Sequence, residues 1–503
     1  MELCTVAPIG STNFIGKQPI RSNRSFLIHN NQDLNVKDTK EKIRMKKRRL
    51  SILVVFLMLI MLMSSLAGCG SVNVKTNAID SSNSKHIKSI TAITEVFGNG
   101  QKVSAVAVEY DQNIDNSKLK ISDYSVEGKT ITKVYANTEA AKASQGVNGK
   151  YVIIELSTAI SPDTGNGPGN GPANGASDGQ NGNAQQGASQ GANPPSGGGP
   201  SLGSAATDSA ESKPLTVNVI QSGDITTADG QTYKADASVM TNSKDINLVM
   251  EDFKQLVYTD PNYNNEKLMY NLYVPKNYDP SKKYPLVLFM HDAGVVSNNP
   301  ISTLTQGLGA VIWATPLEQA KHECFVLAPQ YTSVIADDNS QTSEPMDITV
   351  DLVKDLEKQY SIDPNRLYNT GQSMGGMTSI AMDIKYPDMF AASLLVACQW
   401  DATKVTPMAK DNLWIIVSEG DNKAYPGMDA ITEALKKQGA TVSKATWSAQ
   451  SSTAEFATDV SNMLAKDCNI NYTVFKNGNH RYTWQYAYTI EGVRDWLFKQ
   501  VKK

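Results

Sequence analysis

The second half of the chain alternates strand-like and helical segments, and this alternation constrains the fold more than any other feature. From about Asp252 onward, continuous apolar runs typical of fully buried strands are separated by segments with helical spacing, such as 348–360. The apolar runs are 285–290, 324–329, 390–396, 413–417 and 472–475. Strands that alternate with helices form a mostly parallel sheet covered on both faces. We therefore predict an α/β domain over 250–503, closed by a helix over 486–501.

One turn inside this domain has a pattern typical of a nucleophile. Gly371-Gln372-Ser373-Met374-Gly375 matches G-x-S-x-G, follows a strand-like segment and opens a helical segment over 374–386. The flanking glycines lack Cβ atoms, so the chain can turn sharply and expose the serine hydroxyl at the tip. Gly376 extends the pattern where helix and strand must pack closely. The sequence predicts Ser373 as a nucleophile.

A serine hydroxyl needs a base, and His480 is the only histidine after Ser373 in the chain. It follows the last apolar run and is predicted to lie in a loop. An acid that orients the imidazole should follow a strand between the two. Asp421 comes after the penultimate apolar run and is the favoured acid, with Asp401 and Glu419 as alternatives.

Two backbone amides are candidates for stabilising a developing oxyanion. One belongs to Met374, next to the nucleophile, and the other to Ala293, in the turn His291-Asp292-Ala293-Gly294 after an apolar strand. His291 is a candidate for shaping this turn by hydrogen bonds or for lining a substrate pocket. Trp400 is a candidate pocket residue, with an ordinary core position as the alternative.

The first half of the chain predicts a different domain, over 87–245. Short strand-like segments separated by turn residues are typical of a β-sandwich; they are 103–110, 130–135, 151–156 and 215–220. Residues 162–213 consist almost entirely of Gly, Asn, Gln, Ser, Ala and Pro, and such a segment buries too little apolar area to offset its ordering entropy. We predict a disordered insertion within the β-domain; the alternative is a plain interdomain linker.

The N-terminal region predicts export. Basic residues 46–49 precede the apolar stretch 50–63, and small residues end the run at Leu66-Ala67-Gly68-Cys69. This ending resembles the lipobox of bacterial lipoproteins, which implies a signal peptide over 45–68 and lipidation of Cys69 at the extracytoplasmic face of the cell membrane. A transmembrane anchor is the alternative. Residues 69–86 are expected to form a tether, and 1–44 a doubtful or disordered extension ahead of a true start at Met45.

Composition excludes some classes of function. The chain has 47 basic and 50 acidic residues, so it lacks the basic excess expected of a nucleic-acid-binding protein. Cysteines are isolated in sequence, which disfavours a disulfide framework and favours buried free thiols at Cys324 and Cys398. We expect no metal and no cofactor.

The order Ser373, Asp421, His480 on an alternating β/α background resembles the α/β-hydrolase superfamily. The segments Ser-Ile-Asp-Pro-Asn-Arg-Leu-Tyr before Gly371 and Ser-Met-Gly-Gly after it are similar to the esterase and polyhydroxyalkanoate-depolymerase-like branch. A β-sandwich ahead of the hydrolase resembles esterases with an immunoglobulin-like N-terminal domain. That resemblance implies a serine carboxylesterase acting on small or polymeric esters, with oligomerisation through the β-domain as an expectation.

The same triad is compatible with other functions. A serine peptidase or a polyester depolymerase would use the same three residues, because a triad fixes acyl transfer and not the leaving group. A non-catalytic binding lipoprotein is the alternative from another class.

Overall fold

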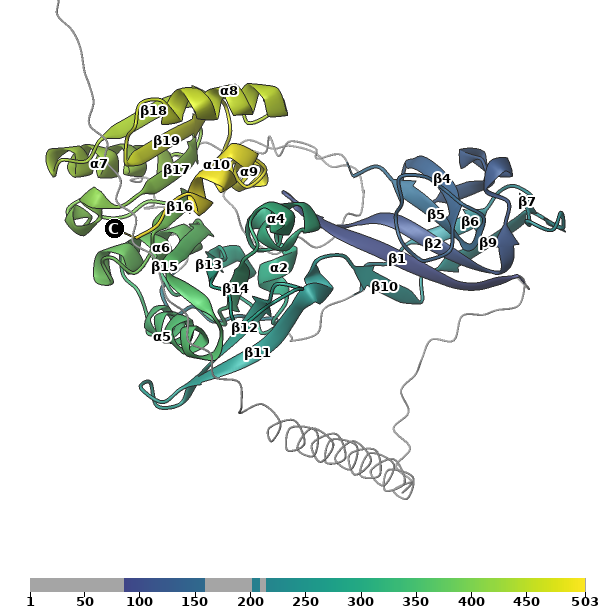
Figure 1. Cartoon of the computed structure of the whole chain (residues 1–503), viewed down its shortest axis with the longest axis horizontal. Helices are drawn as coiled ribbons and strands as arrows, with labels where there is room; N and C mark the ends of the chain where they lie inside the picture. The colour runs from purple at the N-terminus through teal and green to yellow at the C-terminus, as the bar shows by residue number, and fades with distance from the viewer. Residues whose placement is uncertain (1–85, 159–200, 209–213, 503) are drawn as a thin grey trace, which may run out of the picture. The chain divides into compact units, whose positions relative to one another are not determined.

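The computed structural model describes residues 86–158, 201–208 and 214–502 (Figure 1). The predicted signal peptide, Cys69, the tether up to residue 85 and most of the insertion lie outside these residues. All described residues belong to one compact unit, Ile79–Lys503. In this described part, no helix combines the length and the apolar character needed to cross a bilayer.

The N-terminal domain consists of two main β-sheets. The larger has the order β10-β1-β2-β5-β4 and the smaller β3-β6-β9, with a short β7-β8 hairpin beside them. The strands are β1 (Ile87–Phe97), β2 (Gly100–Ile114), β3 (Tyr124–Val126), β4 (Ile131–Asn137), β5 (Gly149–Leu156), β6 (Asn218–Gln221), β7 (Ile225–Thr226), β8 (Thr232–Tyr233), β9 (Asp236–Thr241) and β10 (Lys244–Asn247). Side chains from both sheets, including Val106, Val152 and Val219, share one apolar core, as a sandwich requires.

The C-terminal domain is built on a nine-stranded sheet with the order β11-β12-β14-β13-β15-β16-β17-β19-β18. Its strands are β11 (Phe253–Asp260), β12 (Glu266–Tyr273), β13 (Tyr284–Met290), β14 (Phe325–Gln330), β15 (Ile362–Gln372), β16 (Ala392–Val396), β17 (Leu413–Ser418), β18 (Val442–Trp447) and β19 (Ile470–Phe475). β12 pairs antiparallel with both β11 and β14, and the remaining pairs are parallel.

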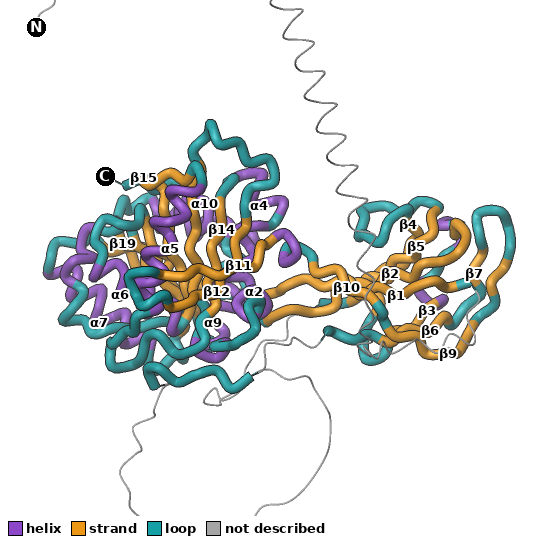
Figure 2. Tube along the Cα trace, turned by 90° about the horizontal axis from the view of Figure 1, so that it is seen from below, coloured by secondary structure: helices purple, strands orange, loops and turns teal. Residues whose placement is uncertain are grey.

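Helices cover both faces of this sheet (Figure 2). They are α2 (Ser302–Thr305), α3 (Leu308–Val311), α4 (Pro316–Lys321), α5 (Pro345–Gln359), α6 (Met374–Lys385), α7 (Ala424–Lys437), α8 (Thr453–Leu464), α9 (His480–Ala487) and α10 (Glu491–Phe498). Along β13, Leu286 and Leu288 pack into one core with α5, α6 and α7, whereas Val287 and Phe289 pack into another with α3, α8 and α10. The predicted fold class, a β-sandwich followed by a mostly parallel α/β sheet, is confirmed.

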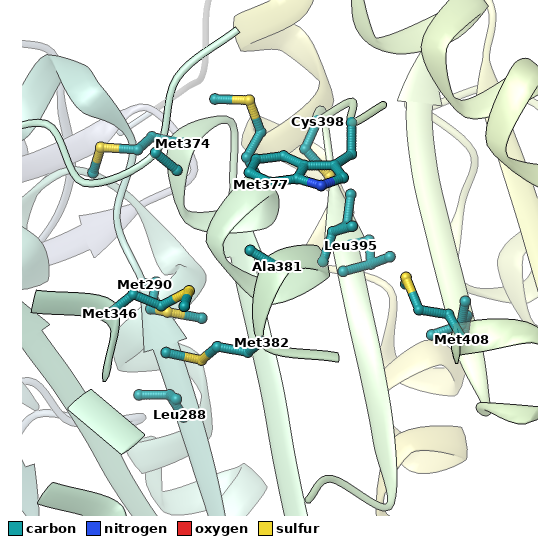
Figure 3. Packing of buried hydrophobic residues seen from close by; sticks show 14 of the residues in the cluster. Leu288, Met290, Met346, Met374, Met377, Ala381, Met382, Leu395, Cys398 and Met408 are labelled. Atoms are coloured by element: carbon teal, nitrogen blue, oxygen red, sulfur yellow. The ribbon is translucent and has the colours of Figure 1, made fainter. Parts of the chain in front are cut away.

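The core around α6 is rich in methionine. Met374, Met377 and Met382 of α6 belong to the same buried cluster as Leu288 and Leu395 of the sheet, and Met382 lies near Leu288 (Figure 3). Methionine is unbranched and fills irregular gaps, so it suits the space between a helix and a twisted sheet. This packing fixes the N-terminal end of α6, where the nucleophile pattern lies.

Two predicted elements need correction. The single closing helix over 486–501 is two short helices, α9 and α10, because Tyr488–Ile490 leave the helical path and the Tyr488 carbonyl accepts a 2.6 Å hydrogen bond from Arg494. Residues 201–208, inside the predicted disordered insertion, are ordered, since Ala205 forms a β-bridge with Ser333. Backbone hydrogen bonds to another segment order this stretch although it has few apolar side chains.

Candidate active site

Ser373 lies at a strained turn between β15 and α6. Its backbone has φ 52° and ψ −117°, a conformation that side-chain-bearing residues rarely adopt. The Ser373 amide donates to the Val396 carbonyl at 3.0 Å, and the Met377 amide donates to the Ser373 carbonyl at 2.9 Å. Strain of this kind persists only when the surroundings hold it in place.

The glycines after the serine are required by close packing. A Cβ on Gly375 would lie 1.9 Å from the Met290 carbonyl oxygen at the end of β13. A Cβ on Gly376 would lie 2.7 Å from the Cys398 sulfur. The buried free thiols predicted at Cys324 and Cys398 are confirmed. These contacts place the start of α6 against the ends of β13 and β16, the strands on either side of β15. The Ser373 turn is partly exposed between these two strand ends.

The structure brings Ser373, His480 and Asp421 together. His480 Nε2 lies 2.9 Å from the Ser373 Oγ, and His480 Nδ1 lies 2.5 Å from Asp421 Oδ2. Because a carboxylate only accepts hydrogen bonds, Nδ1 carries the proton and Nε2 presents its lone pair to the serine hydroxyl. This arrangement can remove a proton from Ser373.

The Asp421 side chain lies beside the His480 imidazole as an ionised carboxylate. Its side chain is 4% exposed, whereas that of His480 is 40% exposed. Burial opposes ionisation of Asp421, but the hydrogen bond and charge of His480 and the backbone amides of Ala424 and Lys423 outweigh it, so the pKa of Asp421 is lowered. Those amides donate to Oδ1 at 3.0 and 3.2 Å.

His480 is the first residue of α9 and therefore does not lie in the predicted loop. Asn479 caps this helix, accepting a 2.8 Å hydrogen bond from the Tyr482 amide. One turn further on, the Trp484 ring lies edge-to-face against the imidazole, with centroids 5.0 Å apart. Trp484 was not predicted as a site residue from the sequence. Residues i and i+4 share a helix face, so a predicted helix starting at His480 would have indicated it.

The alternative acids, Asp401 and Glu419, accept hydrogen bonds from residues other than His480. Asp401 accepts from the Thr403 amide and hydroxyl at 2.9 and 2.7 Å. Glu419 accepts from the Asn477 amide at 3.1 Å. Among the described contacts of His480, the carboxylate partner is Asp421.

The predicted oxyanion donors lie on adjacent turns. Met290 of β13 is in register with Gly371 of β15, so the turn after β13 lies beside the Ser373 turn. Ala293 begins a 3₁₀ helix, Ala293–Val295, which Asp292 caps by accepting from the Gly294 amide at 2.8 Å. The other Asp292 oxygen accepts from Gln372 Nε2 at 2.9 Å, which ties this turn directly to the strand that carries the nucleophile.

His291 and Trp400 lie in the interior, which corrects their candidacy as pocket residues. His291 is fully buried; its Nδ1 donates to the Asp292 carbonyl at 2.8 Å and its Nε2 accepts from the Tyr331 amide at 2.9 Å. Burial lowers the pKa of His291 and keeps the ring neutral. His291 shapes the turn through these hydrogen bonds, as the preferred interpretation of the sequence held. Trp400 is 8% exposed and belongs to the apolar core, where the indole removes its large surface from water.

A cavity of about 790 Å³ adjoins these residues. The Asp292–Ser297 turn and the α9 residues Arg481 and Trp484 line one side, and residues 204–208 and 98–101 line the other. No sequence pattern indicated that residues 98–101 and 204–208 approach the site.

One cluster has the residue types of a metal site. Glu318, His322 and Asp495 each place a ligand atom within 4.8 Å of the others. Glu318 is paired with Arg494 at 2.8 Å, and His322 with Asp495 at 2.8 Å, so these side chains are engaged with each other and with a cation.

Two family models match the chain, one over each domain. Residues 89–234 match the family described as "Esterase Ig-like N-terminal domain", and residues 262–496 match the family described as "Putative esterase". The chain is an esterase. Its hydrolase domain carries the α/β-hydrolase-like fold expected of a hydrolase acting on ester bonds.

Solved structures include a crystal structure of a thermostable esterase that is 26% identical to this esterase. The match covers 82% of this chain and 100% of the other, with a TM-score of 0.64. A feruloyl esterase module from Clostridium thermocellum complexed with sinapinate is 16% identical over 50% of this chain and 89% of its own, with a TM-score of 0.36. No curated protein matches the chain.

Proposed function

We propose that the esterase is a serine carboxylesterase that works through an acyl-enzyme on Ser373. The observation that carries the proposal is the continuous hydrogen-bonded path from the Ser373 hydroxyl through His480 to Asp421. The match to the esterase family supports an ester as the bond cleaved.

The reaction follows from this path in two half-reactions. Ser373 Oγ attacks the ester carbonyl carbon while its proton passes to His480 Nε2, and the amides of Met374 and Ala293 are the proposed donors to the developing oxyanion. Collapse breaks the bond to the alcohol, whose oxygen takes the proton from His480. A water molecule then attacks the acyl-serine, giving up a proton to His480, and the acid leaves as that proton returns to Ser373 Oγ.

The observations bear differently on the two alternative functions. A serine peptidase or polyester depolymerase would use the same path, and the esterase family match favours ester hydrolysis. A non-catalytic binding lipoprotein would have no need for the strained Ser373 backbone or the low pKa of Asp421.

The test is covalent labelling combined with turnover. A fluorophosphonate should label Ser373 in the folded protein, and Ser373→Ala should abolish labelling and lower the hydrolysis of p-nitrophenyl acetate by about three orders of magnitude or more. Ser379→Ala is the matched control: Ser379 lies on the same helix, but its hydroxyl donates to the Gly375 carbonyl at 3.0 Å. Unlabelled Ser373 in a folded wild-type protein would reject the acyl-enzyme and favour the binding lipoprotein.

We further propose that the esterase is exported and anchored at the extracytoplasmic face of the cell membrane through lipidated Cys69. The support is the order of basic residues 46–49, apolar residues 50–63 and the Leu66–Cys69 ending. A lipid anchor would hold the enzyme at the membrane surface while its site faces external esters.

A further inference from the structure

We propose that residues 201–208, here called the strap, form a wall of the alcohol-binding pocket of the esterase and favour esters whose alcohol part carries hydroxyl groups. This inference rests on the proposed function and adds a subsite to it. The strap lies within residues 89–234, the range that matches the esterase Ig-like N-terminal domain, and outside the esterase match over 262–496.

The strap is fastened to the hydrolase domain along its length. The Gly203 amide donates to the Val334 carbonyl at 2.8 Å, the Val334 amide donates to the Ser204 carbonyl at 3.0 Å, and the Ala206 amide donates to the Thr332 carbonyl at 2.7 Å. Ala205 and Ser333 form the antiparallel bridge between these bonds. A short polar segment gains a defined position in this way, because its backbone groups form hydrogen bonds with the segment Thr332–Val334.

Asp208 holds the far end of the strap. Its carboxylate accepts from the Ser297 hydroxyl and, at 3.0 Å, from the Asn298 amide, while the Asp208 carbonyl accepts from Asn298 Nδ2 at 3.0 Å. Ser297 directly follows the turn that carries Ala293. The strap is therefore attached to the same loop that supplies a proposed oxyanion donor.

The cavity behind the strap lies on the leaving-group side of the site. During acylation His480 must give its proton to the alcohol oxygen, so the alcohol part lies beside the helix that begins with His480. Arg481, Trp484 and Gln485 of that helix line the cavity, together with Ser204–Asp208 of the strap.

The lining is suited to a polar group that can both donate and accept hydrogen bonds, and it includes one cation, Arg481. Side-chain amides and hydroxyls contribute to it: Asn99, Gln101, Thr207, Thr305, Gln306 and Gln485, of which Gln101, Thr305 and Gln306 also form hydrogen bonds within the protein. The two carboxylates of the lining are already engaged, Asp208 with Ser297 and Asn298, and Asp292 with Gln372 and Gly294. Amides and hydroxyls both donate and accept, so they match the hydroxyl groups of an alcohol better than an alkyl chain.

The experiment compares two acetates that differ only in the alcohol, glyceryl monoacetate and propyl acetate. The wild-type esterase should prefer glyceryl monoacetate in kcat/KM, and Asp208→Ala should lower that preference about fivefold or more, mainly through KM, because the wall loses its anchor. Asp208→Asn keeps an acceptor oxygen and should restore most of the preference. Asp279→Ala is the matched control, since Asp279 also accepts from a serine hydroxyl and a backbone amide, those of Ser281, outside the cavity lining.

A second variant tests the strap from its middle. Ala206→Pro removes the amide that donates to Thr332, and it should lower the glyceryl preference in the same direction as Asp208→Ala. Fluorophosphonate labelling of each variant verifies that the site is folded. An unchanged preference in both labelled variants, or a wild type that prefers propyl acetate, would overturn the strap proposal. Absence of wild-type labelling and of all turnover would instead reject the proposed function.

Discussion

The carboxylate of Asp421 determines which nitrogen of His480 carries a proton. It accepts from Nδ1 at 2.5 Å, and two backbone amides on its other oxygen keep it ionised. An amide at this position could present its NH₂ group to Nδ1 and favour the tautomer with the proton on Nε2. That tautomer cannot take the proton of Ser373.

Asp421→Asn should therefore lower kcat by about four orders of magnitude while leaving the fold intact. The measurement is p-nitrophenyl acetate hydrolysis, with thermal unfolding as the check on folding. Asp401→Asn should keep near wild-type activity, because Asp401 accepts from Thr403 and not from His480. An inactive Asp401→Asn beside an active Asp421→Asn would reverse the assignment of the acid.

Sequence reasoning located Ser373 and His480 for different reasons. The serine lies in a motif whose glycines are explained by sterics, and the histidine is the only one downstream. Asp421 was the favoured acid, but Glu419 and Asp401 also follow strand-like runs, and the hydrogen bonds of the three carboxylates distinguish them. The role of His291 also depended on burial, since a buried ring with both nitrogens bonded cannot bind a substrate.

At the scale of elements, α6 carries a buried acid that the reaction does not use. Asp383 lies between α6 and the sheet, and Asn369 Nδ2 donates to its Oδ1 at 3.0 Å. Burial, reinforced by the charge of Asp411, raises the pKa of Asp383 well above its ordinary value. The folded protein therefore retains a proton at Asp383 at pH values where the unfolded chain has lost it.

This retained proton makes stability depend on pH. A raised folded-state pKa gives a contribution that is complete below the unfolded pKa of about 4 and is lost as pH rises toward the folded pKa. Asp383→Asn has no such proton to lose, so its melting temperature should exceed that of the wild type by about 2–4 °C at pH 7, the shift expected for roughly 1 kcal/mol. The difference should shrink toward pH 4.

Thermal unfolding followed at several pH values measures this difference. Asp279→Asn is the control, because the Asp279 carboxylate is exposed and hydrogen bonds to Ser281 lower its pKa. A melting temperature difference for Asp383→Asn that stays constant from pH 4 to pH 7 would contradict a buried, protonated Asp383.

Central elements were predictable and edge elements were not, for a physical reason. β13 and β17 are buried on both faces and read as continuous apolar runs in the sequence. β11 and β18 lie at the two edges of the sheet, where exposed side chains interrupt any apolar run. The strap was not predictable because its side chains follow no apolar pattern. Backbone hydrogen bonds to Thr332–Val334 order it instead.

At the scale of the whole molecule, the esterase combines a catalytic domain with segments that the hydrolase fold does not supply. The β1–β2 turn approaches α9 so closely that a Cβ on Gly98 would lie 2.0 Å from the Gln485 carbonyl oxygen. The strap, which lies between β5 and β6 in the sequence, reaches the same cavity. Two segments of the β-domain therefore contribute to the lining of this cavity.

The N-terminal export pattern gives a prediction for the full chain. When the gene is expressed in a bacterium that processes lipoproteins, the esterase should incorporate labelled palmitate and partition into the detergent phase, and Cys69→Ser should abolish both, because the thiol is the acceptor of the lipid. Cys468→Ser is the matched control, since Cys468 is a partly exposed free thiol in the folded region. Ester hydrolysis should persist in both variants, since Cys69 has no part in the proposed path from Ser373 to Asp421 and Cys468 donates to the Lys466 carbonyl. Palmitate incorporation that survives Cys69→Ser, or an esterase that stays in the membrane without its lipid, would favour the transmembrane anchor over the lipobox.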